Sequence, residues 1–159
     1  GKPLPYMPFA YKHPDYWKLI KSESKRTGDM INSWKLFDDS EKANPLTEEE
    51  MIKVENIKGN LLLIGASDDV LWDTVRYIRR MEKRLQNKKH ECHVTIETYE
   101  HGTHFIFPES MLKKIMPVFS GTFVKIAFQA ARKYPDECKK ARIDIDKKVR
   151  KAIEEWTER

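Results

Sequence analysis

The sequence has 159 residues, of which 40% are hydrophobic and 35% charged, as expected for one soluble, partly helical domain. No apolar run approaches the roughly 20 residues of a membrane-spanning helix. Two cysteines without a CxxC spacing exclude a disulfide framework and argue against a thiolate metal site. We therefore expect a cytoplasmic protein with no metal or cofactor.

The net charge of +5 raises the question of a nucleic-acid partner. The 30 basic residues are, however, interspersed with 25 acidic ones, a pattern typical of solvated helix faces. No sequence signature of a nucleic-acid-binding module is present, so we expect neither nucleic acid nor membrane as a partner.

The first third of the chain predicts short helices joined by polar and proline-rich connections. The predicted elements are an extended connector over 1–13, helices over 14–26 and 30–37, a loop over 38–46, and a short helix ending near Val54. Thr47 and Glu50 have the spacing of a capping box, which predicts the start of that last helix.

The centre of the chain predicts a strand, a helix and a second strand. The apolar run Asn60–Ile64 indicates a strand buried on both faces, and the alternation over 94–99 indicates another. Between them, 72–87 carries apolar residues at spacings of three and four, which predicts an amphipathic helix. The three elements form a βαβ unit, so the strands should be parallel.

The last third predicts a loop with a short helix over 100–120 and helices over 122–134 and 143–156. The expected fold class is therefore α/β, with two parallel strands, flanking helices and an incomplete sheet. Because two strands cannot cover the edges of an open sheet, we expect pairing with another chain or with a missing part of the fold.

Charged side chains follow both predicted strands. Asp68 and Asp69 follow the first strand, and His104 lies in a glycine-containing loop after the second. Each alone has an ordinary explanation, as a helix cap or a surface histidine. Together they lie at the same end of a parallel sheet, in the acid-then-histidine order of α/β-hydrolases. There an acid orients the imidazole, which takes a proton from the nucleophile.

Residues 57–72, 81–85 and 99–108 resemble the C-terminal catalytic domain of acyl-CoA thioester hydrolases and bile acid-CoA:amino acid N-acyltransferases, and the likeness extends over roughly 3–135. It implies that Asp69, the second Asp of the pair before Trp72, is the catalytic acid. It also implies that His104, rather than His101, is the base. Asp68 would be a neighbour of the site and Trp72 a packing residue.

The nucleophile of that family lies in a G-x-[SC]-x-G elbow, which has no counterpart here. We therefore expect a fragment, with 1–56 as a connector and lid-like helical segment and 57–159 as the C-terminal βαβα portion of an α/β-hydrolase domain. The expected substrate is an acyl ester or acyl-CoA thioester, and the expected partner is a second copy or the missing N-terminal half. A non-catalytic interaction module that retains half of the hydrolase fold is the alternative.

Overall fold

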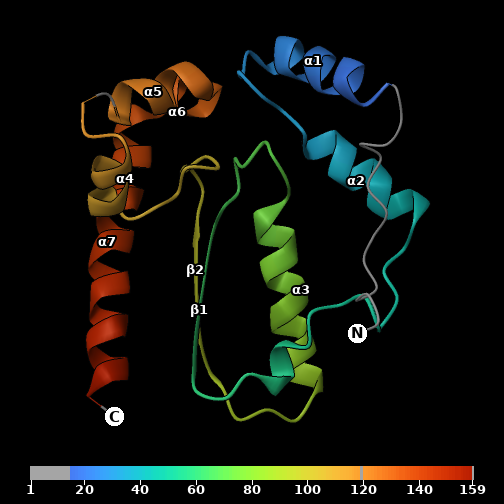
Figure 1. The fold of residues 1–159 in the computed structure, drawn as a ribbon, viewed down its shortest axis with the longest axis vertical. Helices are drawn as coiled ribbons and strands as arrows, with labels where there is room; N and C mark the ends of the chain where they lie inside the picture. Colours follow the sequence, from blue (N-terminus) through green and yellow to red (C-terminus); the bar gives the residue numbers. More distant parts are fainter. Residues whose placement is uncertain (1–14, 119, 159) are drawn as a thin grey trace.

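The computed structural model describes residues 15–118 and 120–158 (Figure 1), so the connector predicted over 1–13 lies outside the described residues. The described part has two strands, several helices and one 3-10 turn. The elements are α1 (Tyr16–Thr27), α2 (Trp34–Ala43), the 3-10 turn η2 (Val54–Asn56), β1 (Asn60–Ala66), α3 (Thr74–Asn87), β2 (His93–Tyr99), α4 (Glu109–Ile115), α5 (Ser120–Ala127), α6 (Gln129–Lys133) and α7 (Pro135–Thr157).

The two strands pair in parallel along their whole length, from Asn60 opposite His93 to Ala66 opposite Tyr99. Helix α3 lies on one side of this pair and α7 on the other (Figure 1). The predicted α/β class, with two parallel strands flanked by helices, is therefore confirmed, and so is the helix predicted over 72–87.

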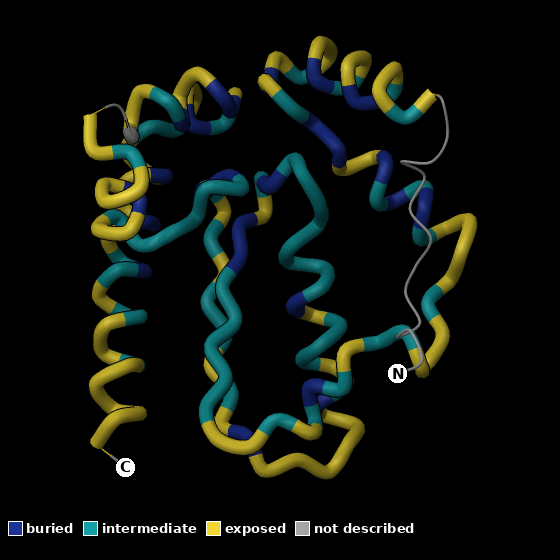
Figure 2. The backbone as a smooth tube through the Cα atoms, viewed as in Figure 1, coloured by how far each residue is buried: buried dark blue, intermediate teal, exposed yellow. Residues whose placement is uncertain are grey.

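The strand pair is less buried than the apolar run of β1 predicts. Residues 60–64 are only half-buried, and burial is complete only at Gly65 and Ala66 (Figure 2). Strand β1 is hydrogen-bonded on one edge only among the described residues, because the sheet there consists of β1 and β2 alone. In addition, a cleft of about 400 Å³ opens between the strands and the C-terminal half of α7, with Leu62 and Trp156 in its lining. The prediction of burial on both faces was therefore wrong.

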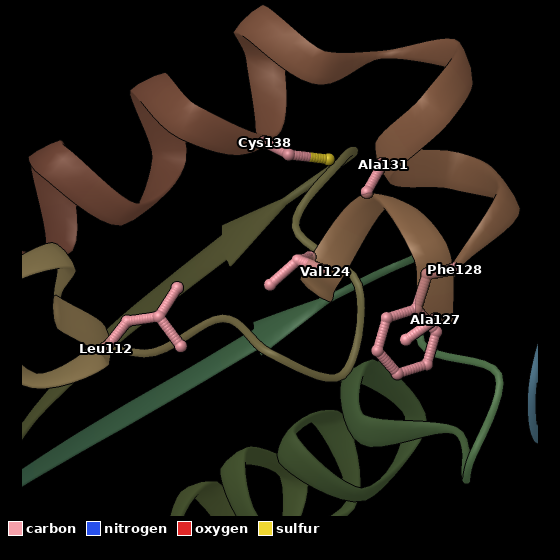
Figure 3. Packing of buried hydrophobic residues seen from close by; sticks show 6 residues of the cluster. All are labelled: Leu112, Val124, Ala127, Phe128, Ala131 and Cys138. Atoms are coloured by element: carbon pink, nitrogen blue, oxygen red, sulfur yellow. The ribbon is translucent and has the colours of Figure 1, made fainter. Parts of the chain in front are cut away.

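The main hydrophobic cluster lies beside the ends of the strands, where α4, α5, α6 and α7 meet (Figure 3). Its buried members are Leu112, Val124, Ala127, Phe128, Ala131 and Cys138. Phe105, from the loop that follows β2, packs against this cluster. The cluster thus supports the loop that carries His104. A smaller cluster of Val54, Leu85 and Cys92 lies among η2, the end of α3 and the start of β2.

Helix α2 begins later and ends later than predicted, because long-range contacts select its position. The backbone N–H of Ser33 donates to the carbonyl of Val70, which keeps the preceding residues out of the helix. The predicted loop over 38–46 is helical as far as Ala43. Its buried Asp38 pairs with Arg76 of α3 at 2.7 Å, an interaction that no local pattern indicates.

The capping-box residues interact only in part as predicted, because the Thr47 hydroxyl binds the Glu50 side chain rather than a backbone N–H, and they do not open a helix. Both the backbone N–H and the hydroxyl of Thr47 donate to Glu50 Oε2, at 2.8 and 2.7 Å. They close a turn, and the next helical residues are those of η2.

The helix predicted over 122–134 is two helices, broken at Phe128, whose backbone is extended (φ −129°, ψ 130°). In an unbroken helix, the Gln129 N–H would donate to a backbone carbonyl of the preceding turn. Here it donates instead to Asp29 Oδ1 at 2.7 Å. The last helix is longer than predicted and begins at Pro135. Proline is favoured in the first turn of a helix, so Pro135 marks the start of this helix. No helix in the described part of the chain is long and apolar enough to cross a membrane.

Candidate active site

The carboxylate of Asp69 is buried and held in one orientation at the end of β1. Its Oδ1 accepts from the backbone N–H of Leu71 at 2.9 Å, and its Oδ2 accepts from the hydroxyl of Thr74. Only 4% of the side chain is exposed. These two donors come from the turn before α3 and from its first residue, so the start of the helix sets the direction of the carboxylate.

The structure brings His104 onto this carboxylate, as the topology predicts. Its Nδ1 lies 3.1 Å from Asp69 Oδ2 and 3.2 Å from Asp69 Oδ1. The His104 ring also packs edge-to-face against the Trp72 ring, with ring centres 4.5 Å apart. The Trp72 ring packs in the same way against Phe37. Because an ionised carboxylate can only accept, Nδ1 carries the proton in this contact, and in the neutral ring Nε2 is then the nitrogen with a free lone pair. The arrangement can therefore take a proton at Nε2 while Asp69 stabilises the resulting cation.

The loop that carries His104 contains a backbone conformation that the sequence does not reveal. Thr103 is fully buried and has a φ of 60°, the left-handed region that a β-branched residue rarely adopts. Asp68 Oδ1 accepts from the backbone N–H groups of Gly102 and Thr103, at 3.0 and 2.7 Å. Sequence reasoning placed Asp68 near the site without assigning these contacts.

The neighbouring His101 makes a different set of contacts. Its Nδ1 lies 3.3 Å from Asp68 Oδ2, and its ring stacks on Tyr134 with centres 3.6 Å apart and planes 9° apart. Tyr134 joins α6 to α7, about 30 residues further along the chain, and no sequence signal connects it to the histidine loop. The two histidines thus have separate acidic partners.

In the described part of the chain, neither the Ser33 hydroxyl nor the thiols of Cys92 and Cys138 are hydrogen-bonded to His104. The hydroxyl of Ser33 donates to the carbonyl of Leu71 at 2.8 Å. Cys92 belongs to the cluster beside the start of β2, at the opposite end of the sheet. Burial raises the pKa of the Cys138 thiol to about 11, so near neutral pH it is protonated and a poor nucleophile. Within the same residues, no group of three or more metal-ligating side chains could hold a metal ion.

Comparison with known proteins gives a match to a protein family. No curated protein and no solved structure matches the chain significantly. The sequence model described as BAAT / Acyl-CoA thioester hydrolase C terminal matches residues 6–127, which is most of the chain. The matched segment includes β1, α3, β2 and both Asp69 and His104. This chain therefore belongs to the BAAT / acyl-CoA thioester hydrolase C-terminal family.

Proposed function

We propose that this chain supplies the acid, Asp69, and the base, His104, of a Ser/Cys-His-Asp triad that cleaves an ester or an acyl-CoA thioester. The observation that carries the proposal is the contact of 3.1 Å between His104 Nδ1 and the buried Asp69 carboxylate. It lies where two parallel strands end, the usual place for catalytic groups in open α/β sheets. Membership of the family supports the same chemistry.

In this mechanism, His104 Nε2 takes the proton of a serine hydroxyl or cysteine thiol as that group attacks the acyl carbonyl. The proton then passes to the leaving alcohol or thiol, and an acyl-enzyme forms. Water, or another acceptor deprotonated by His104, releases the acyl group. Asp69 keeps Nδ1 protonated throughout and stabilises the imidazolium.

The nucleophile and the oxyanion-hole donors come from outside this chain, since it has no G-x-[SC]-x-G elbow. Either a second copy or the missing N-terminal half of the fold would supply them. The strand edges support such a partner, because the sheet of the described residues has two strands only and both outer edges are open.

A chimera tests this proposal. Residues 6–127 replace the matching segment of an active enzyme of the family, so that the nucleophile is present. His104→Ala should then lower kcat/KM by at least roughly 10³-fold, and Asp69→Asn by a similar factor, as removal of triad members does elsewhere. His90→Ala is the control, since His90 is exposed and precedes β2 at the opposite end.

The outcome that contradicts the proposal is a folded, active chimera in which His104→Ala behaves like His90→Ala. A folded chimera without activity in any form would favour the alternative, an interaction module that keeps this half of the fold.

A further inference from the structure

The carboxylate next to the candidate acid makes a second set of contacts, directed at backbone rather than at a ring. Asp68 Oδ1 accepts from both Gly102 N–H (3.0 Å) and Thr103 N–H (2.7 Å). Its Oδ2 lies 3.3 Å from His101 Nδ1. One side chain after β1 therefore binds three consecutive residues of the loop after β2, ending immediately before His104.

The loop bound by Asp68 holds a conformation that it would not keep unaided. A threonine with a φ of 60° places its branched Cβ in steric conflict with the backbone, so surrounding contacts must impose the conformation. The convergence of two successive N–H groups on one carboxylate oxygen is such a contact. The Thr103 hydroxyl adds another, because it accepts from the backbone N–H of Phe105 at 3.1 Å.

Close packing beneath the loop leaves it little freedom to move as a body. A Cβ added at Gly102 would collide with Ile106 and come within 3.0 Å of the Ala66 Cβ. The ring of His101 is stacked on Tyr134. The base of the loop rests directly on the end of β1 and cannot shift. A change in the Thr103 backbone would therefore move His104, the residue that follows it.

We propose that Asp68 is a positioning residue for His104, acting through the backbone of Gly102 and Thr103. The two adjacent carboxylates thus have separate tasks: Asp69 binds the imidazole, and Asp68 holds the left-handed turn that presents the imidazole to Asp69. The catalytic importance of Asp68 rests on the proposed function, but its effect on the His104 ring does not.

Nuclear magnetic resonance of the full chain with ¹⁵N-labelled histidine tests the proposal without turnover. In the unmutated chain, His104 should give a protected Nδ1–H signal and the ¹⁵N shifts of the Nδ1–H tautomer. Asp68→Ala should abolish that signal and yield a mixture of tautomers, with the remaining backbone spectrum still dispersed. Asp68→Asn should keep the signal, because an amide oxygen can accept from the same two N–H groups.

Two further variants complete the design. Asp146→Ala is the matched control: Asp146 also binds a distant backbone N–H, that of Ser110 at 3.2 Å, but it does so at the start of α4 and should leave His104 unchanged. If Asp68→Ala unfolds the chain, adding Thr103→Gly should restore folding and the Nδ1–H signal, since glycine adopts a positive φ without support.

The positioning role would be overturned if Asp68→Ala left the Nδ1–H signal and the tautomer of His104 unchanged. It would also be overturned if the double variant, Asp68→Ala with Thr103→Gly, folded but lacked the Nδ1–H signal. Failure of the triad itself would appear separately, as a chimera whose activity does not depend on His104 while the spectroscopic effect of Asp68 remains.

Discussion

Replacing Ile78 by aspartate should test how far the fold depends on the contact between α3 and the sheet. Ile78 is 2% exposed and lies against β1, with its Cδ1 only 2.8 Å from where a Cβ would stand on Gly65. An aspartate there would lie away from solvent and must bind a proton to avoid a buried charge. At pH 7 this costs about 4 kcal/mol, because the usual pKa is about 3.9 and each unit is worth about 1.4 kcal/mol.

The lost burial of the isoleucine adds about 2 kcal/mol, so the total of about 6 kcal/mol is comparable with the whole stability of a typical domain. The measurement is urea unfolding followed by circular dichroism. Ile52→Asp is the control, since Ile52 is 74% exposed and the change should stay within about 0.5 kcal/mol. At pH 4 the loss of unfolding free energy caused by Ile78→Asp should be smaller, because protonating the aspartate then costs little free energy. Equal midpoints for the two variants at pH 7 would refute the packing of α3 described above.

Three other outcomes are expected. The chain alone should not hydrolyse short acyl esters or acyl-CoA above background; turnover that His104→Ala abolishes would mean that the chain contains its own nucleophile. Arg84 holds the pKa values of Glu48 and Glu55 at about 2 through hydrogen-bonded ion pairs, so these carboxylates contribute stability above about pH 4.5 that is lost as the pH falls towards 2. In urea unfolding over that pH range, the free energy of unfolding of Arg84→Met should therefore fall less than that of the unmutated chain. An equal fall in the two proteins would contradict the pairing. Light scattering should detect a dimer or larger assembly, because the sheet edges are open in the described residues, whereas a clean monomer at high concentration would count against association.

Local patterns in the sequence were sufficient for the central βαβ unit. Apolar and β-branched runs identify β1 and β2, and the apolar stripe of α3 recurs at helical spacing. The connection between parallel strands then places Asp69 and His104 at one end of the sheet, before any contact is known. This inference succeeds because strand direction alone determines which loops meet.

Tertiary contacts decided what the local patterns missed. The break between α5 and α6 depends on Asp29, which is 100 residues away in sequence from the Gln129 N–H that it binds. The left-handed backbone of Thr103 depends in the same way on Asp68, at a separation of 35 residues. In both cases a distant carboxylate binds a backbone N–H and thereby stabilises a local conformation that the residues themselves do not favour. The sequence alone therefore determined which strand ends and side chains meet, and the folded structure determined the backbone conformation that directs His104 towards Asp69.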